Sequence, residues 1–519
     1  MASKMLMGDM PELMENILKH LNNEIYSLYS CVLVNRHWCK MSIPILWQDP
    51  FSIIRKSSFI PIYFSSLGED EKLVIKECLK EFGINMEFSK PLFDYARFLK
   101  ILNIYLLEQK VKGWFEWMRL KLDNPFLLHY DLRTTPLITL TVKLFLESGA
   151  ILHEFGLYNS EFLKFELEIF RSLEQNEKFF SRLQYLSLNI ISNFSIENIA
   201  KLLIVLAKNT TKINTLRLVF HSDESKLIHT LSPALIRFIK SQEQLRKFIF
   251  DGDDGPTEFY GIISALESQK NSLQEVTLED CVFSEEFEIL NNCKNLETLR
   301  ILDCDTELLK ILDYNISTLE ISHYDVLIII QILEKTGILL QRLKIKTAIV
   351  IWEESLLLKA LKSFCPNIIY LYIKDIGLST QLLELIGNLQ KLQFFSLGYA
   401  YYTSKEERKI QVMQFAKILP STLQYLDIAL GIPGTLLDSF IDILLDHCNA
   451  PLKKLLISSV SLNNEKNSKS LIRYCTRIRT LNCVGIVRYY ELDYDIRNEL
   501  KNMLHWYHID ILLLIVKCN

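Results

Sequence analysis

The chain has 519 residues, of which 49% are apolar, and a formal net charge of −4. A single compact core rarely reaches this size, so several domains or one elongated array of repeats are expected. Acidic and basic residues are mixed along the chain, and glycine and proline are sparse, with 16 and 13 residues. These features argue against global disorder, a flexible linker and a clustered basic face for nucleic acid or a membrane surface.

The cysteines and the two chain ends indicate in which cellular compartment the protein is expected. Eleven cysteines occur without CxxC pairs, which fits a reducing compartment better than a disulfide framework. Residues 1–11 hold no apolar stretch long enough for a signal peptide, and the apolar run 509–516 is too short to span a bilayer. The sequence therefore predicts a cytoplasmic or nuclear protein that binds neither nucleic acid nor membrane.

The first fifty residues are rich in large apolar side chains. After Pro11, which a first helical turn tolerates, apolar residues follow at helical spacing. They are Leu13, Ile17, Leu18 and Leu21, and after them Leu28 and Val34. About forty residues in three short helices cannot enclose this many apolar side chains, so a partner should cover part of the surface.

A short motif gives this segment a family resemblance. Met10-Pro11-Glu12-Leu13, Ile17-Leu18, Leu21, Leu28, Val34-Asn35-Arg36-His37-Trp38 and Trp47 follow one another in the order of an F-box. Roughly residues 8–50 resemble that family, although Met10 replaces its usual leucine and the Pro-to-Leu interval is one residue short. The resemblance implies docking on the adaptor of an SCF-type cullin-RING ubiquitin ligase. Its adaptor-facing residues would be Met10, Pro11, Leu13, Ile17, Leu18, Leu21, Leu28, Val34 and Trp38. The alternative is an ordinary helical cap on a solenoid.

Residues 51–150 are helical in composition but poorly periodic. Helices are predicted within 77–82 and 91–108, and Trp114, Phe115 and Trp117 form an aromatic cluster. Such a cluster more often packs at a domain junction than binds a ligand. We interpret the region as a rigid connection.

From about residue 152 the pattern L-x-x-L-x-L recurs, with aliphatic residues exchanged freely. The copies begin at Leu183, Ile213, Leu245, Leu273, Leu296, Ile316, Leu340, Ile368, Leu392, Leu423, Leu452 and Ile478, with Leu152 starting a degenerate first copy. The spacing of 20 to 32 residues lies near that of leucine-rich repeats. The alternating core predicts a short strand with one buried face. Helical stretches are predicted between strands, at 196–208, 235–241, 260–268 and 436–446.

One copy is a cysteine-containing repeat. Residues 293–304 match C-x-x-L-x-x-L-x-L-x-x-C, and Cys365 and Cys475 precede their repeats at the same distance. The thiols lie about one repeat or more apart, so small buried groups are favoured over metal ligands. This subtype resembles that of substrate-receptor F-box proteins.

The predicted fold is α/β, a short three-helix F-box followed by a leucine-rich-repeat solenoid with a curved parallel sheet inside and helices outside. The expected boundaries are 1–50 for the F-box-like domain, 51–150 for the connection, 151–490 for the solenoid and 491–519 for a C-terminal cap.

No motif of nucleotide binding, zinc hydrolysis or serine catalysis occurs, and His505 and His508 lack a nearby third ligand. The sequence thus predicts no catalytic residue, no metal and no cofactor. The resemblance implies a substrate-recognition subunit of an SCF-type ligase, which links a target protein to the adaptor and cullin for ubiquitination. The alternative is a leucine-rich-repeat interaction scaffold outside the ubiquitin system.

The residues flanking the last two aliphatics of each copy point away from the core. One row of them reads Arg342, Tyr370, Phe394, Tyr425 and Lys454, and the next reads Lys344, Tyr372, Ser396, Asp427 and Leu456. Lys346 and Lys374 lie on a third row, and Tyr399, Tyr401 and Tyr402 follow in a loop. The predicted substrate-binding residues are Arg342, Lys344, Lys346, Tyr370, Tyr372, Lys374, Phe394 and Tyr425. Aromatic and Arg side chains are common interface anchors, and a basic edge favours an acidic or phosphorylated segment. The alternative is that pleated surfaces simply tolerate aromatic residues.

Overall fold

The structure is a computed structural model of the 519-residue chain. It describes residues 11–21, 24–53, 56–120, 131–158, 172, 175–190, 196–220, 225–252, 258–311, 315–322, 325–346, 353–399, 405–430, 441–458, 470, 473–478, 480–481, 483–487, 505–507 and 513–517. The chain divides into two compact units, residues 1–273 and 274–519.

The first unit begins with three short helices. They are α2 (Pro11–His20), α3 (Ile25–Val32) and α4 (Arg36–Leu46). Asn35 caps α4 by accepting a hydrogen bond from the backbone N–H of Trp38 at 2.9 Å, which explains why the helix begins there. One side of these helices is buried in a small core of Met14, Leu18, Leu28, Cys31, Ile43 and Leu46.

Aromatic packing joins these helices to the rest of the unit. The ring of Trp47 lies edge-on to those of Phe59 and Tyr63, with centroids 5.9 and 5.3 Å apart. Phe64 packs in the same way on the buried Trp114, at 5.3 Å. The elements involved are α5 (Pro50–Ile53), α6 (Ile60–Ser66), α7 (Glu69–Lys80), α8 (Ile104–Leu120) and α9 (Asp131–Glu147). Trp114 therefore serves the core, as expected of a packing cluster.

The prediction of a helix over 91–108 is wrong. A 3-10 turn, η2 (Tyr95–Phe98), is followed by strand β1 (Ile101–Asn103), and α8 begins only at Ile104. The cause is tertiary pairing, because β1 pairs in parallel with β2 and buries Leu99 and Leu102. The sheet thus begins about fifty residues before the first predicted repeat.

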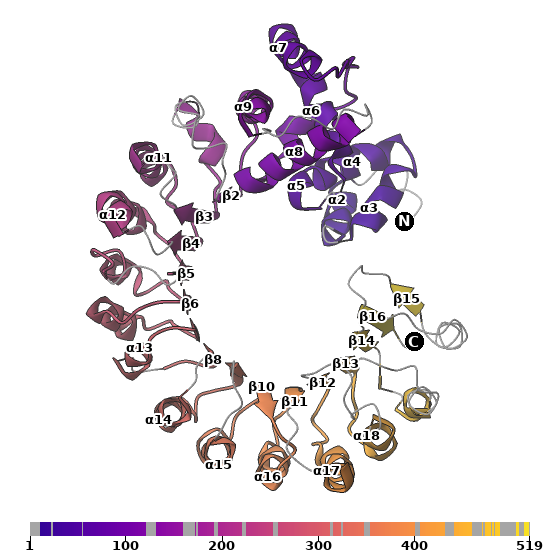
Figure 1. The fold of residues 1–519 in the computed structure, drawn as a ribbon, viewed down its shortest axis with the longest axis vertical. Helices are drawn as coiled ribbons and strands as arrows, with labels where there is room; N and C mark the ends of the chain where they lie inside the picture. The colour runs from indigo at the N-terminus through magenta and orange to yellow at the C-terminus, as the bar shows by residue number, and fades with distance from the viewer. Residues whose placement is uncertain are drawn as a thin grey trace. The chain divides into compact units, whose positions relative to one another are not determined.

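In the first unit, strands β1 to β5 lie in sequence order, and each strand pairs in parallel with the next one (Figure 1). The later strands are β2 (Glu154–Leu157), β3 (Tyr185–Ile190), β4 (Thr215–Phe220) and β5 (Lys247–Asp251). Helices α11 (Ile196–Asn209) and α12 (Ser225–Ser241) connect β3 to β4 and β4 to β5. Helix α11 matches the predicted stretch 196–208, whereas α12 begins ten residues before the predicted stretch 235–241.

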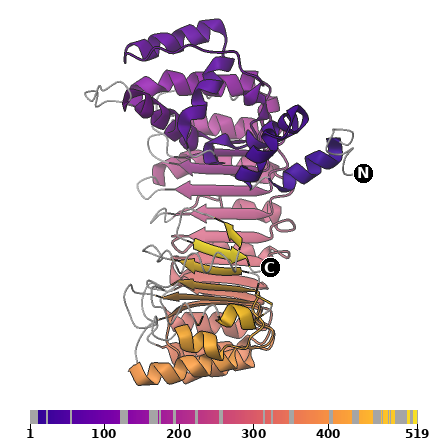
Figure 2. The ribbon, with the colours of Figure 1, turned by 90° about the vertical axis from the view of Figure 1, so that its right-hand side faces the viewer.

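The second unit continues the same architecture, with parallel neighbours in sequence order from β6 to β14 (Figure 2). Its strands are β6 (Glu275–Glu279), β7 (Thr298–Leu302), β8 (Thr318–Ser322), β9 (Arg342–Lys346), β10 (Tyr370–Ile376), β11 (Phe394–Tyr399), β12 (Tyr425–Leu430), β13 (Lys454–Ser458) and β14 (Cys483–Val487). Its helices are α13 (Thr306–Ile311), α14 (Val326–Thr336), α15 (Glu354–Phe364), α16 (Thr380–Asn388), α17 (Lys405–Ile418) and α18 (Ile441–His447). Within this unit the strands follow the inner side of an arc and the helices its outer side.

The predicted register of the repeats is confirmed. Leu299 lies opposite Leu319, and Leu343 opposite Leu371, so the aliphatic positions of successive copies stack in a column. These four side chains are at most 1% exposed. Each repeat therefore buries its apolar face against its neighbours, which is the organisation of a leucine-rich-repeat solenoid.

Three details differ from the prediction. Val484, not Leu481, lies opposite Leu455, so the last repeat is shifted by three residues. The stretch predicted as helical over 260–268 is mostly a 3-10 segment, η5 (Ser264–Gln269). Residues 491–504 lie outside the described part of the chain, whereas β15 (His505–Tyr507) and β16 (Leu513–Lys517) pair antiparallel beside β14.

Cys293, Cys304 and Cys365 are buried, as predicted, whereas Cys475 is only half-buried. Burial raises the pKa of the Cys365 thiol to about 12, so this thiol is a packing group without thiolate character. In the described ranges, no cluster of three or more His, Cys, Asp or Glu side chains is placed to hold a metal ion. No helix in these ranges combines the length and the apolar character needed to cross a membrane.

Candidate functional site

Two surfaces stand out, one in each unit. The first comprises exposed apolar side chains on the N-terminal helices, called here the N-terminal stripes. They are Leu13 and Ile17 on α2, Tyr26 and Tyr29 on α3, and Leu33 and Val34 directly after it. Six of the seventeen large apolar side chains exposed among the described residues thus fall within 22 positions. Such a density is typical of a surface that a partner covers.

Helical geometry explains the stripes. Leu13 and Ile17 are four residues apart and share one face of α2, whereas Met14 and Leu18 point into the core. Tyr26, Tyr29 and Leu33 are spaced i, i+3 and i+7, so they also share one face, which runs along α3 and just beyond its end. The N-terminal stripes therefore lie on the faces of α2 and α3 that point away from the small core.

The structure corrects part of the predicted adaptor-facing set. Leu18 and Leu28 are 0% and 1% exposed, so they pack inside the helical core and are unavailable to a partner. Leu21 and Trp38 are half-buried, and Leu13, Ile17 and Val34 are exposed. Pro11 begins α2, and Met10 lies outside the described residues. Tyr26, Tyr29 and Leu33 were missed, although the i, i+3, i+7 spacing could have identified them.

The second surface lies on strands β9 to β13, and the sequence predicted its register correctly. Tyr370 lies opposite Arg342 on one side and Phe394 on the other. The row continues with Tyr425 and then Lys454. We call these five residues the aromatic ladder.

Neighbouring side chains of the aromatic ladder are in contact. The ring centroids of Tyr370 and Phe394 are 6.3 Å apart, and those of Phe394 and Tyr425 are 6.0 Å apart. The guanidinium of Arg342 lies 4.9 Å from the Tyr370 ring, within the range of a cation–π contact. All three rings are half-buried. The three rings are therefore a pre-ordered apolar strip with a cation at each end, Arg342 and Lys454.

The predicted basic edge, in the row that contains Lys344, includes an acidic residue as well. Glu320 of β8 lies opposite Lys344 and accepts ion pairs from Lys344 at 3.0 Å and from Lys346 at 2.8 Å. It also pairs with Arg300 at 3.3 Å. Burial raises the pKa of Glu320, but the hydrogen bonds from Lys346 and Lys344 outweigh it, so the pKa lies below its ordinary value. The two predicted lysines thus share a single internal carboxylate, which offsets about one of their two charges.

The same row contains a carboxylate with spare hydrogen-bonding capacity. Ser396 of β11 donates a hydrogen bond to Asp427 Oδ2 at 2.8 Å. Asp427 Oδ1 is buried and has no hydrogen-bond partner among the described residues. Burial raises the pKa of this carboxyl, although the bond from Ser396 opposes the effect. A buried acceptor without a partner is costly, so this carboxylate is a locally unfavourable polar group in the row.

The other residues of the predicted substrate-binding surface contribute less to the aromatic ladder and its surroundings. Lys374 is exposed, after the register shift that follows Ile373. Tyr372 lies 5.3 Å below the ammonium group of Lys344. Tyr399 ends β11, and Tyr401 and Tyr402 lie outside the described residues.

Comparisons with known proteins assign neither a family nor a function to the chain. No family model matches the chain, and no curated protein matches it. Solved structures that resemble it include the leucine-rich repeat-containing protein LegL7 from Legionella pneumophila (14% identity, TM-score 0.35, 54% of this chain and 95% of that one). They also include an internalin, inlF, from Listeria monocytogenes (13%, 0.30, 64% and 88%). A third is a complex of Rad7 and Elc1 in yeast (14%, 0.30, 68% and 88%).

Proposed function

We propose that the chain is a substrate-recognition subunit of an SCF-type ubiquitin ligase. The N-terminal stripes bind the adaptor, and through it a cullin, while the repeats hold a target protein. The chain performs no chemistry itself. It raises the effective concentration of target lysines near the ubiquitin-charged enzyme.

The observation that carries the proposal is the exposure of Leu13, Ile17 and Val34 within a segment that resembles an F-box. Their helices have a core of their own, so the exposed face is left for a partner. An ordinary end cap of a solenoid has a polar outer face instead.

The aromatic ladder is the proposed contact for the target. Half-buried rings in fixed positions lose little conformational freedom on binding, which suits them as anchors. Because Lys344 and Lys346 share the carboxylate of Glu320, the basic edge is weaker than two free lysines would make it, and a strongly acidic target is not required.

The test is affinity capture of the full chain from cells, followed by identification of its partners. The proposal predicts that the adaptor and a cullin are recovered together with target proteins, and that the targets accumulate when the chain is depleted. Recovery of target proteins without adaptor or cullin would instead identify a scaffold outside the ubiquitin system.

A further inference from the structure

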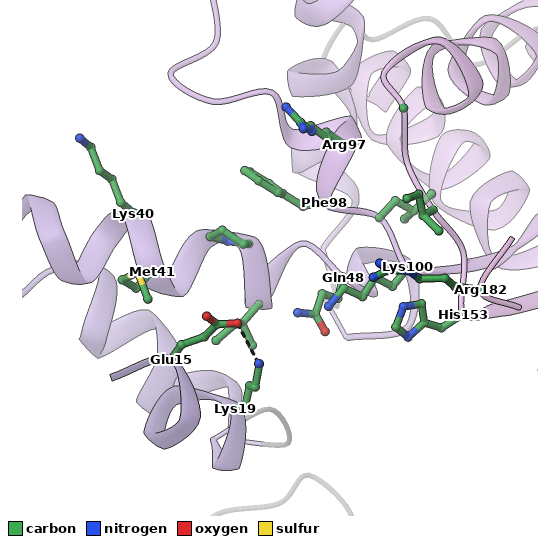
Figure 3. A pocket seen from close by; sticks show the side chains of 15 residues that line it. Glu15, Lys19, Lys40, Met41, Gln48, Arg97, Phe98, Lys100, His153 and Arg182 are labelled. Atoms are coloured by element: carbon green, nitrogen blue, oxygen red, sulfur yellow. Dashed lines mark ion pairs between the residues drawn. The ribbon is translucent and has the colours of Figure 1, made fainter. Parts of the chain in front are cut away.

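A pocket of about 440 Å³ lies in the first unit, between the N-terminal helices and the beginning of the sheet (Figure 3). Five lysine and arginine side chains line it, together with His153 and a single carboxylate. The cations are Lys19, Lys40, Arg97, Lys100 and Arg182, and the carboxylate is Glu15. None of these residues belongs to the N-terminal stripes or to the aromatic ladder.

The one carboxylate is already engaged. Glu15 pairs with Lys19 at 2.8 Å, one turn apart on α2. Lys40, Arg97, Lys100 and Arg182 form no ion pair with a described residue. Among the described residues, the pocket therefore has more positive than negative side chains, with Glu15 as its single carboxylate.

Backbone pairing holds the floor of the pocket in place. The N–H of Lys100 donates to the carbonyl of Gln48 at 2.9 Å, and the N–H of His153 donates to the carbonyl of Lys100 at 2.7 Å. Lys100 directly precedes β1 and His153 directly precedes β2, so the start of the parallel sheet fixes both backbones. Their side chains come together with that of Arg182 in Figure 3.

The cations of the floor repel one another. Burial and the charge of Lys19 lower the pKa of Lys100, and burial, Lys100 and Arg182 lower the pKa of His153. A bound anion would relieve this repulsion, and charge-assisted hydrogen bonds to it are strong.

We propose that this pocket binds a small, multiply charged oxyanion of the phosphate class. Its volume lies within the range of small-molecule sites, and the side chains of Lys100, His153 and Arg182 lie together at its floor (Figure 3), whereas nucleic-acid binders spread their charges over a face or along a helix. Met41, Ile45 and Phe98 complete the walls, so a phosphate ester with a compact apolar part also fits. The proposal is independent of the ligase function.

The test uses pyrophosphate and inorganic phosphate as probes, titrated into the full chain by calorimetry. Saturable binding with one site is expected, tighter for pyrophosphate. The double variant Lys100→Gln/Arg182→Gln should weaken it by about tenfold or more, since each lost charge-assisted bond removes more than about 1 kcal/mol. The single variant Lys100→Arg should retain binding.

The matched control is Lys201→Gln/Lys208→Gln, which removes the same charge from exposed positions of α11 in the same unit. It should change the affinity by less than about twofold. Without anion, Lys100→Gln/Arg182→Gln should melt no lower than the parent, because it removes repulsion. Should the double variant fail to fold, the exposed Arg182→Gln alone should still weaken binding several-fold. Absence of saturable binding to the parent, or equal losses in the pocket and control variants, would overturn the proposal.

Discussion

The Tyr370 and Phe394 rings stack across strands β10 and β11, with centroids 6.3 Å apart, although 24 residues separate them in the chain. Each occupies the same position of its repeat. Only the stacking of successive repeats brings such positions together, so the ladder is a surface made by the fold itself.

Removing these rings should abolish capture of the target. The double variant Tyr370→Ala/Phe394→Ala deletes two half-buried anchors, and about 2 kcal/mol or more of binding free energy should be lost. Proximity labelling in cells should then recover fewer targets, with adaptor binding unchanged. The control Thr298→Ala/Thr318→Ala changes the same position on β7 and β8 and should leave capture intact. Equal capture by both variants would show that the aromatic residues only suit a pleated surface.

Glu320 should stabilise the second unit in a pH-dependent way. Glu320→Gln removes ion pairs to Arg300, Lys344 and Lys346, and should lower the free energy of unfolding by about 1–2 kcal/mol, since these partners are part-exposed to solvent. The folded-state pKa of Glu320 is lowered. Its contribution is therefore present above the unfolded pKa of about 4.3 and is lost as the pH falls through the folded value.

Urea unfolding at pH 7 and pH 3 measures this effect. The difference between Glu320→Gln and the parent should be larger at pH 7 than at pH 3, which lies below the unfolded pKa. The exposed Glu297→Gln serves as control and should differ little at either pH. A Glu320 effect that is the same at both pH values would contradict the ion-pair account.

Gln269 should be a strong stability determinant in the first unit. Its side-chain amide donates to the carbonyls of Gln242 at 2.7 Å and Ile239 at 3.0 Å, and its Oε1 accepts from the N–H of Leu245 at 3.3 Å. The residue is 2% exposed, so Gln269→Leu leaves buried backbone groups unsatisfied and should cost about 2–3 kcal/mol. Urea unfolding followed by circular dichroism measures it against the exposed Gln184→Leu. Similar midpoints for the two variants would refute this role.

Anion binding in the pocket should strengthen as the pH falls. Sulfate keeps its charge between pH 7.5 and 5.5, so a change in its affinity must come from the protein. Burial and the charges of Lys100 and Arg182 hold the pKa of His153 below its ordinary value of about 6.5, so this imidazole is neutral at pH 7.5, and a bound anion would favour its protonation as the pH falls. Sulfate affinity should rise over this interval in the parent and stay flat in His153→Gln. A parallel rise in both proteins would assign the effect to another group.

The repeats were predictable because a short alternating pattern determines both strand and register. Leu343 and Leu371 lie opposite each other, as their places in successive copies require, and the rows of exposed residues followed from that register. The last copy failed because no strong aliphatic follows Leu481 at the required spacing, and Val484 takes its place opposite Leu455.

Other features depended on contacts that the sequence does not encode locally. Leu18 and Leu28 look like the exposed Leu13 and Ile17, and only the packing of α2 and α3 on α4 decides which face is buried. The ion pairs of Glu320 with Lys344 and Lys346 were missed because Glu320 lies one repeat before these lysines. The pocket joins α2 to residues near 100, 153 and 182, which no motif connects.

The measurement that tests the central claim most directly is the affinity of the purified chain for the SCF adaptor. We predict tight binding for the parent and a loss of at least about a hundredfold for Leu13→Asp/Ile17→Asp, because charges would enter a desolvated apolar contact. The control Leu73→Asp/Val74→Asp alters exposed apolar residues on α7 of the same unit and should bind like the parent, with circular dichroism showing both variants folded. Unchanged adaptor binding by the folded Leu13→Asp/Ile17→Asp variant, or no adaptor binding by the parent, would contradict the account.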